Sequence, residues 1–142
     1  MSELTFLQAR DESFNGFAAA WNGLTPIAAP NRVFNPEKVS GPSYTRLAFS
    51  SDLGGQQRLS TSVDRNHFIR SGTMEVGCYV KIGKDLDLAY TNCEVVMRWF
   101  EKPSLSTIMF FDLTPPQDFG EAGGWYQVAV AAQWRYLTDR AA

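Results

Sequence analysis

Hydrophobic and polar residues recur along the chain with two different periods, which predict two helices and several strands. Residues 5 to 22 carry large apolar side chains at a spacing of 3.6 residues, and Asn22-Gly23 favours a left-handed stop at the end of this helix. Residues 85 to 102 repeat the helical spacing and end before Pro103. The expected buried stripes are Phe6, Leu7, Phe14, Phe17, Ala18 and Trp21 on the first helix, and Leu86, Ala89, Tyr90, Cys93, Val96, Met97 and Phe100 on the second.

A period of two predicts the strands. Residues 73 to 82 alternate most clearly, and residues 44 to 50, 107 to 113 and 125 to 137 are further candidates. On the last of these strands, six residues are expected to share the face that packs on the core: Tyr126, Val128, Val130, Ala132, Trp134 and Tyr136.

The segments between these elements have the composition of loops and turns. Val33-Phe34 lies between two prolines and is predicted to be a brief edge strand. Residues 51 to 66 have no apolar period, and residues 115 to 124 are rich in turn-forming residues. We therefore expect a long polar loop in the first of these two segments and a turn in the second.

The order of elements indicates the fold class. A helix, two or three strands, a second helix and two more strands predict an α+β fold in which two helices pack on one face of a mainly antiparallel sheet, as a two-layer sandwich. We expect residues 1 to 142 to form one domain.

Charge and composition narrow the classes of partner. The net charge is -2, which gives no electrostatic reason to expect specific nucleic-acid binding. The sequence has no apolar stretch of the length that crosses a bilayer, so we expect no membrane partner. Glu3, Asp11 and Glu12 occupy the region where a secretion signal carries basic residues, so we expect no such signal.

The residues with reactive side chains do not form a recognised catalytic or metal motif. Cys78 and Cys93 lie in apolar segments and are expected to be buried thiols, with no metal and no cofactor implied. Asp64 and His67 form the best candidate acid–base pair, but no nucleophile accompanies them, and the alternative is that both are solvated loop residues. We therefore expect no catalytic residues and no enzymatic activity.

Two groups of residues are candidates for contacts with a neighbouring subunit or another protein. Arg58 and Arg65 can supply charge-assisted hydrogen bonds from the polar segment 51 to 66, which we expect to be mobile until a partner orders it. Leu88, Val95 and Trp99 lie together on a side of the second helix away from its main apolar stripe, and they are predicted to form a subunit interface. The alternative is that the first helix or the proline-rich connector covers these three residues within the subunit.

Several landmarks along residues 5 to 138 resemble the tail terminator proteins of long-tailed bacteriophages, the family that includes the tail terminator of phage lambda. The landmarks are a first helix ending in Trp21-Asn22-Gly23, the segment IAAPNRVFNP, the strand YTRL, a long polar loop, the strand RSGTMEVGCYV, the second helix and the segment GWYQVAV.

The resemblance implies an α+β structural subunit that forms a hexameric ring. Such a ring caps the tail tube, ends tail polymerisation and offers a surface for joining the head. The implied partners are further copies of the chain, the tail tube protein and a head-completion or neck protein. The implied location is the tail or neck of the virion, after assembly in the host cytoplasm.

Two other functions remain open at this stage. One is a different protein of the head–tail joint, a neck or head-completion protein. The other is a small α+β enzyme or ligand-binding protein with a pocket between helix and sheet. Titratable residues on the inward faces would favour a pocket protein.

Overall fold

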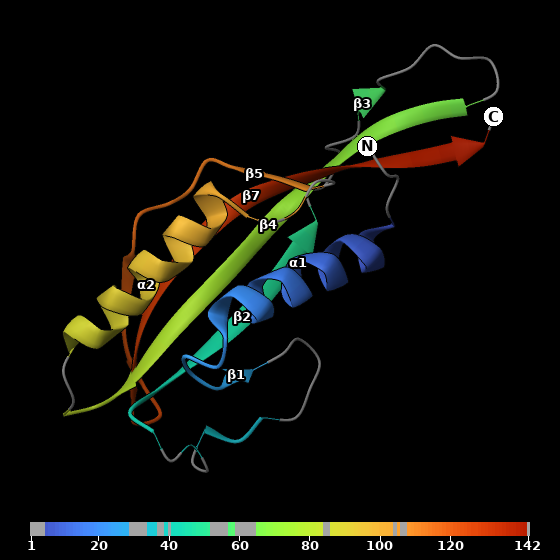
Figure 1. Ribbon diagram of the computed structural model, residues 1–142. Helices are drawn as coiled ribbons and strands as arrows, with labels where there is room; N and C mark the ends of the chain where they lie inside the picture. The colour runs from blue at the N-terminus through green and yellow to red at the C-terminus, as the bar shows by residue number, and fades with distance from the viewer. Residues whose placement is uncertain are drawn as a thin grey trace.

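The computed structural model describes residues 5–28, 34–36, 39, 41–51, 57–58, 65–83, 86–103, 105 and 108–141. Two helices lie on one face of a seven-stranded sheet, which confirms the predicted α+β class (Figure 1). In chain order the elements are α1 (Phe6–Trp21), β1 (Ile27–Ala28), β2 (Ser43–Ser51), β3 (Gln57–Arg58), β4 (Arg65–Lys81), α2 (Leu86–Glu101), β5 (Ile108–Phe111), β6 (Gln117–Ala122) and β7 (Trp125–Ala141).

The sheet is built around two long neighbouring strands. Its order is β1-β2-β4-β7-β5, while β3 also pairs with β4 and β6 with β7. Strands β4 and β7 are each 17 residues long and pair along their whole length, from Arg65 opposite Ala141 to Lys81 opposite Trp125. The pair β1–β2 is parallel and the other pairs are antiparallel, as the sequence predicts for most of the sheet.

One end of the β4–β7 pair extends beyond both helices (Figure 1). We call this end the arm and define it as residues 65–69 of β4 and 137–141 of β7. Strand β3 pairs with residues 68 and 69 on the side of the arm away from β7. The prediction of one loop over 51 to 66 is therefore wrong at Ser51, at β3 and at the start of β4, and its remaining residues lie outside the described part of the chain.

Two short strands, β1 and β6, lie in segments for which the sequence did not predict a strand. The edge strand is Ile27–Ala28, whereas Phe34 is not in a strand and Val33 lies outside the described residues. Strand β6 occupies most of the predicted turn between residues 115 and 124. Its residues are mainly exposed, so they carry no alternation of apolar and polar side chains that the sequence pattern can reveal.

The first helix has well-formed ends. The Thr5 hydroxyl accepts a hydrogen bond from the Gln8 backbone N–H (3.1 Å), while the Gln8 side chain accepts one from the Thr5 N–H (2.9 Å). Asn22 ends the helix in the left-handed conformation (φ 50°), which confirms the predicted stop.

Two residues of the predicted helix stripes, one on each helix, are exposed. On α1, the row Ala9, Ser13, Phe17 and Trp21 is buried, whereas Leu7 is 55% exposed. These four residues are spaced at i, i+4, so α1 lies with this row along the sheet. On α2, Ala89, Cys93, Val96 and Phe100 are buried as predicted, but Tyr90 is exposed.

Gly72 lies where β2 ends beside β4. The Trp134 indole reaches across this glycine and donates a hydrogen bond from Nε1 to the Ser50 carbonyl oxygen (3.3 Å). A Cβ at position 72 would collide with both the Ser50 carbonyl and the Trp134 indole nitrogen. The site therefore requires a residue without a side chain.

We expect Gly72→Ala to lower the free energy of unfolding by about 2 kcal/mol or more, because strand backbone or the Trp134 ring must move. Gly41→Ala is the matched control, since a Cβ there meets nothing within 4 Å, and it should change stability by about 0.5 kcal/mol or less. Urea denaturation followed by tryptophan fluorescence measures both variants. Equal midpoints for the two variants would contradict the proposed packing around Gly72.

Candidate interaction surfaces

The predicted interface on the second helix lies partly inside the subunit. Trp99 is only 8% exposed, and its ring lies 5.4 Å from that of Phe17 in an edge-on contact and 5.3 Å from that of Phe110, centre to centre. Leu88 and Val95 are partly buried and pack against the same core. Trp99 is therefore not exposed as expected, because α1 provides a second apolar surface beside α2, while a subunit contact at the half-buried Leu88 and Val95 stays a prediction.

The contact between the two helices also buries polar atoms. Among the described residues, Ser13 Oγ, Asn92 Nδ2 and Trp99 Nε1 are buried with no hydrogen-bond partner. A buried polar group without a partner costs about 1–3 kcal/mol. Tight packing is also visible at Gly16, where a Cβ would lie 3.1 Å from the Leu105 side chain and 3.6 Å from the Trp99 ring.

Both arginine candidates lie at the arm. Arg58 is in β3 opposite Phe68, and Arg65 begins β4 opposite Ala141. The structure therefore brings these two residues to one end of the sheet, away from Trp99. His67 is also in the arm, opposite Asp139, while its suggested partner Asp64 lies outside the described residues.

The two cysteines are free thiols in the core. Cys78 on β4 and Cys93 on α2 are fully buried, as expected, and the Cys93 thiol donates a weak hydrogen bond to the Val128 carbonyl (3.8 Å). A hydrogen bond that the Cys78 thiol donates to the neighbouring Cys93 sulfur, together with burial, raises the pKa of Cys78 well above its usual value. A protonated, buried thiol is a poor nucleophile, so Cys78 serves packing.

An aromatic cluster occupies the face of the sheet opposite the helices. Tyr44 and Tyr79 stack with their ring centres 4.5 Å apart, and Trp125 meets Tyr44 edge-on at 4.7 Å. Lys81 lies over the Trp125 ring and donates a hydrogen bond to the Val39 carbonyl (3.1 Å). Burial raises the pKa of both tyrosines, while the nearby Arg46 guanidinium opposes that shift.

The alternation of apolar and polar residues did not predict this aromatic cluster. Its three aromatic residues occupy the alternate strand positions that face away from the helices, where we expected small or charged residues. By contrast, Trp134 and Tyr136 pack on the helix side of β7, which confirms their assignment to the core.

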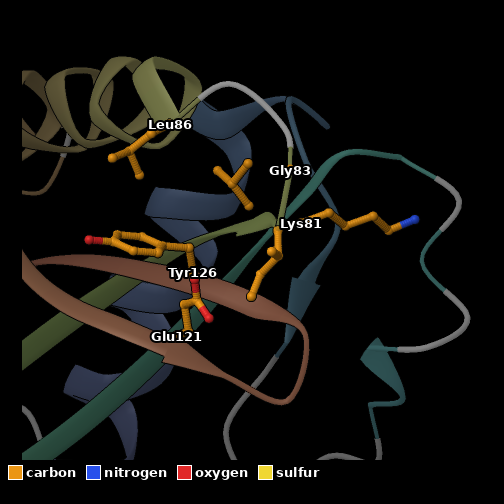
Figure 2. A pocket seen from close by; sticks show the side chains of 7 residues that line it. Lys81, Gly83, Leu86, Glu121 and Tyr126 are labelled. Atoms are coloured by element: carbon orange, nitrogen blue, oxygen red, sulfur yellow. The ribbon is translucent and has the colours of Figure 1, made fainter.

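A shallow pocket opens between the β4–α2 turn and strands β6 and β7 (Figure 2). Its volume is about 80 Å³, well below the roughly 300–1,000 Å³ of typical ligand sites. Leu86 and Tyr126 form apolar walls, and Glu121 adds a carboxylate. The Tyr126 hydroxyl donates to the Asp118 carboxylate, which raises the pKa of this phenol to about 12. The pocket is large enough for one side chain at most.

In the described part of the chain, no three His, Cys, Asp or Glu residues are grouped so that they could hold a metal ion. Over the same residues, no helix has the length and apolar character needed to cross a membrane.

We expect Trp99→Ala to destabilise the subunit by about 3–5 kcal/mol, because it empties the space between the helices. Trp99→Phe should cost less, since it keeps an aromatic ring and removes an unpartnered buried N–H. Glu94→Ala, at an exposed position of the same helix, is the control and should be near neutral. Urea titration gives the three values. A stable Trp99→Ala subunit with a smaller assembled mass would restore the interface assignment.

Stability should fall as the pH rises above about 10. Unfolded tyrosines ionise near pH 10, whereas the raised pKa values of Tyr44 and Tyr79 keep both phenols protonated in the folded chain. The unfolded chain then binds fewer protons than the folded chain, so stability is complete below pH 10 and is lost as the pH rises through the folded-state values. Denaturation midpoints between pH 8 and 11.5 test this. Tyr79→Phe should flatten the decline, and an unchanged slope would contradict its assigned role.

Among the comparisons with known proteins, only those of structure find similarities. No family model and no curated protein matches the sequence. A solved protein structure whose name carries no functional description superposes on 89% of this chain and 94% of its own length, with a TM-score of 0.49 and 12% identity. A similarity at this level carries no conclusion about function.

Proposed function

We propose that this chain is a structural protein of a bacteriophage virion, a tail terminator that forms a ring on the end of the tail tube. The ring, hexameric as in the family that the sequence resembles, stops tube polymerisation and presents a surface to a head-completion or neck protein. The role is one of binding and needs no catalytic residue, metal or cofactor.

The arm is the observation that carries this proposal. It extends the sheet beyond the body that the two helices cover (Figure 1). A ribbon of two strands is marginally stable alone in water, so an extension of the sheet beyond the helices suits a subunit that is held by its neighbours. Arg58 and Arg65, predicted as contact residues, both belong to this end of the molecule.

The face of the sheet away from the helices supports the same proposal. Its exposed residues include the small or polar Ala48 and Gln133, the charged Arg46 and Arg135, and the apolar Met109. Arg135 is held in place, since its guanidinium lies over the Phe111 ring and contacts the Met109 sulfur. A ring protein between two assemblies needs surfaces besides its subunit contacts, and this face provides one.

The test is tube growth in the presence of the purified chain. The tail tube protein of the same phage is polymerised with increasing amounts of the chain and imaged by electron microscopy. We expect ring-shaped density on one tube end and a mean tube length that falls as the ratio of chain to tube protein rises.

Glu94→Ala is the positive control, since it should fold and cap like the natural sequence. Tubes of unchanged length with bare ends would contradict the proposal. Binding to isolated heads without any binding to tubes would assign the chain instead to the head side of the joint.

A further inference from the structure

We propose that copies of this chain join head to tail through their sheets. Residues 137–141 of β7 in one copy add, as a parallel strand, to residues 48–51 of β2 in the next copy. This inference deepens the proposed function, because the choice of a second copy as the occupant rests partly on the ring.

The open edge of β7 follows from the alternation of backbone directions. Thr114 binds both backbone groups of Ala131: its N–H donates to the Ala131 carbonyl (2.8 Å), and its hydroxyl accepts from the Ala131 N–H (3.0 Å). Ala131 therefore directs its backbone groups away from β4, and so does every second residue after it. The unbroken β4–β7 register places Leu137, Asp139 and Ala141 in this set.

Beyond residue 136 this edge has no neighbour among the described residues. Strand β5 pairs with β7 from Gln133 to Tyr136 and then ends. Within the described part of the chain, the outward N–H and C=O groups of the arm meet no other strand. Natural proteins cover, shorten or charge such an edge, because an open one pairs with other chains.

A second open edge lies on the opposite side of the sheet. The Thr45 N–H donates to the Pro26 carbonyl (2.9 Å), so the odd-numbered residues of β2 direct their backbone groups away from β4. Strand β1 pairs with Thr45 and Arg46 only. Among the described residues, nothing pairs with the outer side of Phe49 and Ser51.

The two edges fit each other in direction and in length. Both β2 and β7 are antiparallel to β4 and therefore parallel to each other. The two open edges lie at opposite lateral borders of one sheet. The arm edge of each copy can therefore pair with the β2 edge of the next copy, and no edge is used twice. The β2 edge offers four residues and the arm edge five, which is roughly 13–16 Å of strand. A contact between two different surfaces repeats from copy to copy. It gives a closed ring when the rotation between copies closes and an open filament when it does not, whereas pairing of β7 with β7 would stop at a dimer.

Proline substitutions test the two edges separately. Asp139→Pro and Ser51→Pro each remove one outward N–H, a position at which an edge strand tolerates proline. We expect native mass spectrometry to show the ring for the natural sequence and monomers for each variant. Asp139→Ala and Ser51→Ala are the matched controls, because they keep the N–H groups and should keep the ring.

Mixing the two proline variants provides the sharper measurement. The Ser51→Pro copy retains its arm edge and the Asp139→Pro copy retains its β2 edge, so the mixture should form a one-to-one dimer and nothing larger. Rings from both proline variants would overturn the proposal. Assembly by Ser51→Pro alone would also overturn it, in favour of pairing between two arms.

If a proline variant fails to fold, amide hydrogen exchange on the natural sequence tests the same two edges. The amides of Asp139 and Ser51 should be protected in the ring and lose that protection on dilution to monomers, while the Thr138 amide, which points toward β4, changes less. Equal behaviour of the three amides would overturn the proposal.

The two proposals can fail separately. If the chain forms rings through these edges but the rings leave tube length unchanged, only the proposed function is contradicted. If the chain caps tubes but its proline variants still assemble, only this inference is contradicted.

Discussion

The ladder between β4 and β7 is the interaction on which the rest of the structure depends. Every other strand is attached to one of these two or, in the case of β1, through β2. Val76 and Val80 from β4, with Val128 and Val130 from β7, form the floor on which α2 packs, and all four are fully or almost fully buried. Because the ladder keeps one register throughout, the same two strands also form the arm.

Aromatic side chains connect the first helix to this framework. Phe17 meets Trp99 of α2, while Phe6 meets Trp134 of β7 at a ring-centre distance of 5.8 Å. These rings fill the wide space between α1 and the sheet, and each contributes more buried area than an aliphatic residue can. The cost is the buried indole N–H of Trp99, whereas the indole of Trp134 finds the Ser50 carbonyl across Gly72.

The sequence predicts those parts of the fold whose burial is one-sided. Alternation identifies the body of β4 and β7, and the helical period identifies α2, because one apolar neighbour lies on one side of each. The burial of Trp99 was not predicted, because α2 has two buried sides. The pattern of one helix shows that a second side is apolar but does not show whether another helix of the same subunit or a partner covers it. The polar sequence before Arg70 gave no signal for a strand, because its pairing comes from residues far along the chain. Arg58 and Arg65 were predicted to lie in a loop, and their position on two strands at the arm follows only from the register.

The register of the central ladder also sets the order in which the chain can fold. The glycines at 123 and 124, both with positive φ, close the β6–β7 hairpin locally, and α2 forms from consecutive residues. The ladder itself joins segments that the whole of α2, β5 and β6 separate, so its closure carries most of the loop entropy. Pairing can begin at Lys81 and Trp125, where the separation is smallest, and proceed toward Arg65 and Ala141. The arm is thus the last part of the ladder to close during folding and the first to fray.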